Sequence, residues 1–158
     1  MGMMLPVHWS LLTQWDDDRL DWQGLDDRVQ SALVDFGDPA DPQRPVVMFV
    51  RYAPGITVRP HAHDADYCSI VVQGEVEVTR ERHTVGSVRF VSAGTTYGPL
   101  VAGPEGTTLI DVFADRNGIF PRWAKVADDE RERLQRLDRW LQDRLDRLTP
   151  RAGFTPTG

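Results

Sequence analysis

The sequence predicts an all-β domain followed by a single amphipathic helix. Short segments rich in Val, Ile, Phe, Tyr and Thr recur between residues 28 and 113, separated by turns that carry Gly and Pro. Within residues 75–80, valine alternates with glutamate and threonine, which is the period of a half-buried antiparallel strand. After residue 128 apolar residues recur every three or four positions instead. Regular short strands with glycine-bearing turns are typical of a β-sandwich or β-barrel.

The strands are expected in a barrel that spans residues 28–120. Residues 1–27 mix three tryptophans with an acidic cluster and show no clean period, so they are predicted to form an arm lying over the domain. Pro54 and Gly55 form a type II turn signal, because proline presets the first central φ and glycine accepts the positive second one. The expected strands cover residues 28–36, 46–52, 56–60, 68–73, 75–80, 84–91 and 107–113.

The C-terminal segment predicts one helix over residues 128–149. An aspartate precedes the periodic region and Pro150 ends it. Its leucines fall on one side of the helix, and this apolar side is expected to pack on the barrel, with a dimer contact as the alternative. Residues 150–158 form an expected frayed tail, so the chain is organised as a single domain. The leucines of this side are Leu134, Leu137, Leu141, Leu145 and Leu148.

Composition excludes several classes of partner. The 158 residues carry 24 acidic and 18 basic side chains, a formal charge of −6, so the average field repels nucleic acid phosphates. No apolar run approaches the ~18 residues that a membrane span needs. Cys68 is the single cysteine and cannot form an internal disulfide, which fits a reducing compartment. The first residues lack the pattern of a signal peptide, so we expect a cytoplasmic protein that binds neither nucleic acid nor membrane.

Two histidines one residue apart form the first candidate site. His61 and His63 lie at the end of an expected strand, so both imidazoles leave the same face and can coordinate one ion. Neutral imidazole suits Zn, Fe, Cu and Ni alike, so the histidines do not identify a metal. The spacing from Gly55 through these histidines to Tyr67 and Gly74 is regular, and a second glycine-bearing segment, residues 86–101, leads to Tyr97.

These two segments resemble the motifs of the cupin family, specifically small bacterial cupins of the dioxygenase-like and anti-sigma-sensor-like branches. Tyr67 stands where the family carries Glu, and Tyr97 stands where it carries a ligand His. Ser92 and Val101 replace the usual Pro and Asn of the second motif. The resemblance covers about residues 51–116.

The resemblance implies a double-stranded β-helix, a jelly-roll barrel whose open mouth holds a small-molecule ligand or substrate. Such domains commonly pair as homodimers. It also implies that positions 61, 63, 67 and 97 are the metal-ligand positions, of which two carry the usual residue type here.

Three interpretations of the two tyrosines stay open. In the favoured one, His61 and His63 bind a divalent or ferric ion such as Fe, Zn, Ni or Mn in an oxygenase-like enzyme, with Tyr67, Tyr97 or Asp66 as further ligands. Asp64 and Asp111 are further carboxylates that could serve. In the second, the histidines and tyrosines are the bases and acids of a metal-free isomerase or cyclase. In the third, the barrel binds a small ligand without catalysis. The strand arginines Arg51, Arg59 and Arg89 could meet an anionic substrate, and none is assigned.

Overall fold

The computed structural model describes residues 12–148 of the chain. The first eleven residues of the expected arm and the expected tail lie outside the described residues. Within this range no helix is long and apolar enough to span a membrane. The strands are β1 (Gln23–Asp26), β2 (Val29–Asp35), β3 (Val46–Tyr52), β4 (Thr57–Val58), β5 (His61–Ala62), β6 (Tyr67–Val78), β7 (Glu81–His83), β8 (Val88–Val91), β9 (Leu100–Phe113) and β10 (Arg122–Trp123). The helices are the 3-10 turns η1 (Arg116–Ile119) and η2 (Asp128–Glu130) and the α-helix α1 (Arg131–Arg147).

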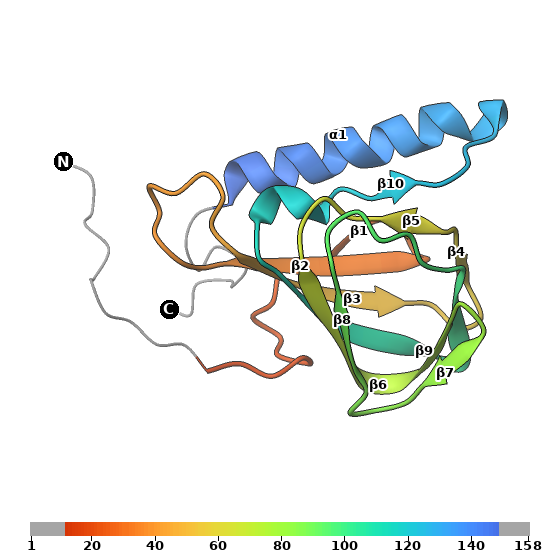
Figure 1. Cartoon of the computed structure of the whole chain (residues 1–158). Coiled ribbons are helices and arrows are strands. Elements are labelled where there is room, and N and C mark those ends of the chain that lie inside the picture. The colour runs from red at the N-terminus through yellow and green to blue at the C-terminus, as the bar shows by residue number, and fades with distance from the viewer. Residues whose placement is uncertain (1–11, 149–158) are drawn as a thin grey trace.

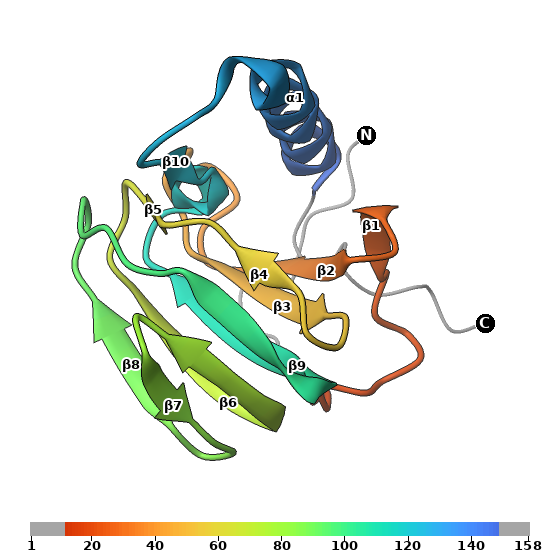
Figure 2. The same cartoon turned by 90° about the vertical axis from the view of Figure 1, so that its right-hand side faces the viewer.

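One curved antiparallel sheet forms the body of the molecule. Its strands follow the order β1-β2-β3-β9-β6-β7, with β4 paired to β9 and β8 paired to β6, while β5 and β10 form a separate pair. Figures 1 and 2 show the sheet curving beneath α1, which lies across it as a second layer. The predicted all-β fold with one C-terminal helix is confirmed.

Alternation along the central strands separates two apolar faces. Val50, Leu109 and Val71 are cross-strand neighbours on β3, β9 and β6, and they point into the barrel as part of one buried cluster. Phe49, one residue before Val50, points to the other side, where Leu20 of the N-terminal segment packs against it. The barrel interior therefore has its own core, and the segment before β2 covers part of the outer face.

The strand boundaries differ from the expected ones in several places. β1 lies within the expected N-terminal arm, β9 begins at Leu100 rather than at residue 107, and the expected strand 56–60 is reduced to Thr57–Val58. The expected strands 68–73 and 75–80 fall in the single strand β6, which ends at Val78, because Gly74 accommodates a register irregularity with φ +70°. A Cβ at this position would lie 2.1 Å from the carbonyl oxygen of Gly106, so only glycine fits. The expected strand 84–91 is shorter, since a turn closed by the Ser87 N–H to Thr84 O bond precedes β8.

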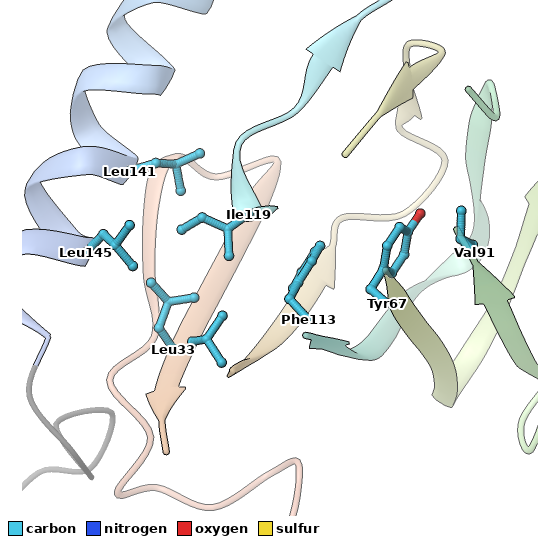
Figure 3. Packing of buried hydrophobic residues seen from close by; sticks show 8 residues of the cluster. Leu33, Tyr67, Val91, Phe113, Ile119, Leu141 and Leu145 are labelled. Atoms are coloured by element: carbon cyan, nitrogen blue, oxygen red, sulfur yellow. The ribbon is translucent and has the colours of Figure 1, made fainter. Parts of the chain in front are cut away.

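Helix α1 packs on the barrel through its leucines, as predicted. Leu141 and Leu145 are buried against Leu33 of β2 and Ile119 of η1. Figure 3 shows this cluster continuing through Phe113 toward the barrel interior. The helix is thus fixed over one end of the barrel by apolar contacts that the leucine period anticipates.

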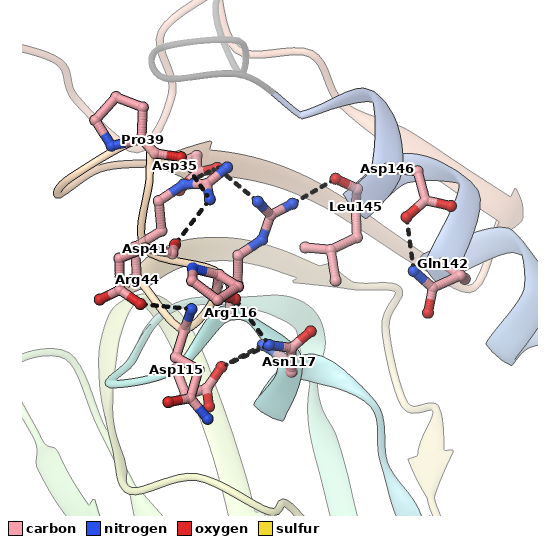
Figure 4. A network of polar contacts seen from close by, with 12 residues as sticks. Asp35, Pro39, Asp41, Arg44, Asp115, Arg116, Asn117, Gln142, Leu145 and Asp146 are labelled. Carbon is pink, nitrogen blue, oxygen red and sulfur yellow. Dashed lines mark hydrogen bonds and ion pairs between the residues drawn. The ribbon is translucent and has the colours of Figure 1, made fainter.

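A buried ionic network holds the C-terminal end of α1. Asp35 is fully buried, and Arg44 donates from Nε to both carboxylate oxygens at 3.0 Å. Arg116 approaches the same carboxylate at 3.5 Å and donates to the backbone carbonyl of Leu145 (Figure 4). Because Asp35 is paired with two guanidinium groups, its buried charge is compensated, and the network joins β2, the loop before β3, η1 and α1.

Candidate functional site

The two sequence motifs meet through the backbone. His61 and Tyr97 form an isolated antiparallel bridge in which each N–H donates to the other's carbonyl oxygen at 3.0 Å. Two residues on, the His63 carbonyl accepts the N–H of Gly94 at 2.8 Å. These bonds place the end of the first motif beside the turn of the second. The side chains of His61 and Tyr97 therefore leave neighbouring backbone positions on the same face of the bridge.

Backbone carbonyls set the tautomer of both histidines. His61 Nδ1 lies 2.7 Å from the carbonyl oxygen of Arg59, and His63 Nδ1 lies 2.8 Å from that of Gly118. A carbonyl oxygen only accepts, so each neutral ring carries its proton on Nδ1 and leaves Nε2 as an acceptor. The Tyr97 hydroxyl lies 2.9 Å from His61 Nε2 and donates to it. Tyr97, His61 and the Arg59 carbonyl thus form one continuous hydrogen-bonded chain.

Both imidazoles are held neutral by their surroundings. Burial lowers the pKa of His61, and burial together with the neighbouring His61 ring lowers the pKa of His63 to about 4. The two rings meet edge to face, with centroids 5.1 Å apart. At neutral pH the site therefore presents two uncharged imidazoles, whose Nε2 atoms can accept a proton or a metal ion.

Tyr97 lies between the histidines and a cation. Burial raises the pKa of its phenol to about 12, and the nearby Asp111 carboxylate adds to the rise. The guanidinium of Arg89 lies 4.1 Å above the Tyr97 ring and acts in the opposite direction. A cation over the ring face favours negative charge on the phenol, so Arg89 stabilises Tyr97 when it gives up its proton.

These groups face a cavity of about 340 Å³ between the barrel and α1. His61, His63, Tyr97 and Asp111 line its barrel side. The helix contributes Leu134, Leu137, Trp140 and Leu141 on the opposite side. The volume lies within the range of small-molecule sites, about 300–1,000 Å³. The site is therefore a helix-roofed pocket with a few polar groups in an apolar wall.

Comparison with known proteins identifies the architecture. No family model matches the chain, and no curated protein matches it in sequence. Among solved structures, the polyketide cyclase RemF from Streptomyces resistomycificus aligns over 84% of this chain and 94% of its own, with 23% identity and a TM-score of 0.55. An RmlC-like cupin from Shewanella frigidimarina aligns over 72% and 95% respectively, with 21% identity and a TM-score of 0.54.

The chain has the cupin fold. A protein from Klebsiella pneumoniae described as having a double-stranded β-helix domain supports the same conclusion, with 18% identity and a TM-score of 0.56 over 74% of this chain and all of its own. The resemblance read from the two motifs is thereby confirmed at the level of fold. At these identities the likeness concerns the fold, and the chemistry depends on the side chains of this chain.

The cupin ligand positions are occupied in different ways. His61, His63 and Tyr97 line the cavity, whereas Tyr67 is not among its lining residues. The Tyr67 ring packs in the core against Phe113, with centroids 4.9 Å apart, and burial strongly raises the pKa of its phenol. Its hydroxyl has no hydrogen-bond partner among residues 12–148. The structure therefore brings the four positions together, since the Tyr67 ring lies 5.1 Å from that of His63 and 6.1 Å from that of Tyr97, but only the other three line the cavity.

The loop aspartates point to other partners. Asp66 is exposed, and its carboxylate accepts the backbone N–H of Ala93 at 2.8 Å. Asp64 pairs with Arg122 at 2.7 Å on the surface. Asp111 is the carboxylate that faces the interior: it is cross-strand neighbour to Ser69 and lines the cavity. Burial raises the pKa of Asp111 to about 6, while Ser69 and Arg89 oppose the rise.

The donor set does not fit a centre of two histidines and one carboxylate. Within residues 12–148, no group of three or more His, Cys, Asp or Glu side chains is arranged to hold one ion. The predicted metal site at His61 and His63 stays a prediction, and its further ligand would have to be a phenol such as Tyr97.

Residues outside the motifs complete the site. Trp123 on β10 pairs in register with His61, and its ring lies 5.1 Å from the His61 ring. Its indole Nε1 is a buried donor with no partner in the described part of the chain. Neither Trp123 nor the leucines of α1 carry a sequence signal for a site, because their place depends on how the C-terminal segment folds back over the barrel. Asp111 is the exception, since it was already a candidate carboxylate in the sequence.

Proposed function

We propose that this cupin-fold protein catalyses proton transfer within a small organic substrate, as a metal-free isomerase or cyclase. One observation carries the proposal: the Tyr97 hydroxyl donates to His61 Nε2 at 2.9 Å inside a cavity roofed by α1. A phenol bonded to a neutral imidazole is a ready proton relay, since the imidazole can receive the phenolic proton while the phenol oxygen takes another. His63 Nε2 is a second neutral acceptor in the same wall.

The relay works without a co-reactant. Tyr97 Oη removes a proton from a substrate carbon next to a carbonyl, the phenolic proton passes to His61 Nε2, and the electron pair of the broken C–H bond moves into an enolate. His61 Nδ1–H keeps its bond to the Arg59 carbonyl throughout. Because burial lowers the pKa of His61, the imidazolium readily returns its proton. Return to a different carbon gives an isomer. Attack of the enolate on a second carbonyl of the same molecule, with the proton returned to its oxygen, gives a ring.

Arg89 and the apolar wall support this chemistry. The Arg89 guanidinium above the Tyr97 ring stabilises negative charge that develops on the phenol. The apolar wall lowers the local dielectric constant, which strengthens this electrostatic effect. The structural likeness to RemF, a polyketide cyclase by description, agrees with a cavity that accepts a ring compound, although at 23% identity it supports only the choice of reactions to test first.

Solvent deuterium exchange tests the proposal directly. The protein is incubated in D₂O with a bicyclic ketone such as α-tetralone, and incorporation next to the carbonyl is followed by mass spectrometry. We expect catalysed exchange, a loss of about 100-fold or more in Tyr97→Phe, and a much smaller loss in the matched variant Tyr67→Phe, whose ring packs near Tyr97 but does not line the cavity. Equal loss in both variants, or no exchange above the buffer rate, would contradict the relay.

A metal-dependent, oxygenase-like enzyme is the second candidate. It is favoured by the orientation of both histidines, because an imidazole whose Nδ1–H is held by a backbone carbonyl directs Nε2 as metal-binding histidines do. Elemental analysis of purified protein, before and after chelation, separates the two. Stoichiometric metal that is lost in His61→Ala/His63→Ala, together with exchange that needs the metal, would support this candidate over the metal-free relay.

A further inference from the structure

Besides Asp111, five charged residues line the cavity, and we call these five residues the rim. Arg28 lies between β1 and β2, Arg59 lies just before β5, and Arg133 lies in the first turn of α1; all three are exposed and line the cavity. The two rim acids are Asp26 and Glu130. Figure 2 views the molecule from the end at which α1 begins, with β4 beneath the helix and β1 to one side.

Two of the rim arginines have no side-chain partner within residues 12–148. Arg59 pairs with Glu130 at 2.6 Å, so the charges of these two side chains compensate each other. The side chains of Arg28 and Arg133 make no ion pair or hydrogen bond within the described residues, and they come from separate elements that border one cavity. The chain as a whole carries a charge of −6, whereas the rim holds three arginines and two acids. The positive excess at the rim is therefore a local feature. Two guanidinium groups that border one cavity and are unpaired within the described residues can bind a planar anion, above all a carboxylate.

The inner end of the cavity favours a hydrogen-bond donor over an anion. Asp111 lines it with 9% of its surface exposed, and its Oδ1 has no hydrogen-bond partner among residues 12–148. A ligand carboxylate at this depth would meet the Asp111 charge and be repelled. A ligand hydroxyl would instead donate to the Asp111 carboxylate and satisfy it. The polar ends of the cavity therefore orient a ligand, with its acid group at the rim and a hydroxyl inside.

The walls between the two ends are apolar and aromatic. Phe113 and Trp123 line the barrel side, and Leu134, Leu137 and Trp140 line the helix side. Flat rings gain both apolar burial and stacking in such a slot. We infer that the cavity binds a hydroxylated aromatic or polycyclic carboxylate, its ring between the barrel and α1, its hydroxyl toward Asp111 and its carboxylate between Arg28 and Arg133. This deepens the proposed function by naming the substrate class, and it rests on the same cavity.

Calorimetric titration with matched probes tests the assignment. The probes are 6-hydroxy-2-naphthoic acid, its methyl ester and 2-naphthoic acid, which share one ring system and differ only in the two polar ends. The hydroxy acid should bind at least tenfold more tightly than the ester, and more tightly than the acid that lacks the hydroxyl. Arg28→Gln and Arg133→Gln should each weaken the hydroxy acid about five- to tenfold and leave the ester unchanged.

Two further variants separate the ends. Arg136→Gln, one turn beyond Arg133 and outside the cavity lining, is the matched control and should bind the hydroxy acid as the wild type does. Asp111→Asn should reduce the advantage of the hydroxy acid over 2-naphthoic acid. The assignment is overturned if the ester binds as tightly as the acid, if both arginine variants weaken acid and ester alike, or if no probe binds at millimolar concentration.

The titration is independent of turnover. Binding with the expected preferences but without deuterium exchange would contradict the proton relay and leave the ligand class supported. Exchange of α-tetralone without any preference for the carboxylate would contradict the ligand class and leave the proton relay supported.

Discussion

The buried Asp111 carboxylate should make the protein less stable as the pH rises. Its side chain lies on β9 between Met48 of β3 and Ser69 of β6, and burial raises its pKa from 3.8 to about 6. A raised pKa means that the native state holds the proton more tightly than the unfolded chain. The stabilising contribution is therefore present at low pH and is lost as the pH rises through about 6.

The size of the effect follows from the two pKa values. Their difference corresponds to about 3 kcal/mol of destabilisation above pH 7, when Asp111 is ionised in both states. Between pH 5 and pH 8 the penalty grows by about 1.4 kcal/mol, because at pH 5 the unfolded carboxyl is already ionised and the native one is not. Asp111→Asn removes this titration while keeping the shape of the side chain. The unfolding free energy of the variant should therefore gain about 1.4 kcal/mol relative to wild type across this interval.

Urea denaturation followed by tryptophan fluorescence at half-unit pH steps measures this difference. Other titrating groups are shared by both proteins, so they cancel in the comparison. Asp129→Asn, an exposed position before α1, is the matched control and should run parallel to wild type. A difference between wild type and Asp111→Asn that stays constant from pH 5 to pH 8 would refute the burial of an ionisable carboxylate at the inner end of the cavity.

Four further outcomes are expected. Asp35→Asn should lower the unfolding free energy by about 3–5 kcal/mol, because it leaves Arg44 buried without its charge partner, whereas Arg147→Gln on the surface should change it by less than about 0.5 kcal/mol; urea denaturation measures both. Leu141→Ala should cost about 2–5 kcal/mol in the same assay by opening a cavity under α1. The pKa of His63 in the native state is lowered to about 4, below the ordinary histidine value of 6.5, so its contribution to the unfolding free energy falls as the pH drops from about 6.5 toward 4. The ring resonances of His63 in NMR should show no titration midpoint between pH 5.5 and 8. Sedimentation velocity should give the homodimer that the cupin resemblance implies, and a monomer at micromolar concentration would contradict that expectation.

The fold could be predicted because its signals are local or periodic. The leucine period placed the helix and its packing side, and the spacing of His61, His63 and Tyr97 between glycines led to the cupin resemblance. The strands were less well delimited, since Gly74 interrupts the register without ending β6. In the sequence a single glycine indicates the end of a strand. In the fold this glycine is an irregularity within one strand.

The site was only partly predictable because it depends on contacts between distant segments. His61, His63 and Tyr97 were expected together, and the backbone bridge brings them to the cavity wall. Tyr67 shares the motif spacing, but its ring turns into the core against Phe113, a contact that no spacing reveals. The cavity roof and Arg133 come from α1, whose place over the barrel mouth is a tertiary outcome.

The metal-free relay requires one protonation state of the His61 ring, which can be measured. Nitrogen-15 NMR of ¹⁵N-histidine-labelled protein at pH 7, with His61 assigned through His61→Gln, reports which ring nitrogen carries the proton. We expect protonated Nδ1 and an unprotonated Nε2 that accepts from Tyr97, unchanged by chelator and shifted in Tyr97→Phe. A proton on Nε2, or a resonance that moves on chelation and returns with added metal, would contradict the metal-free relay.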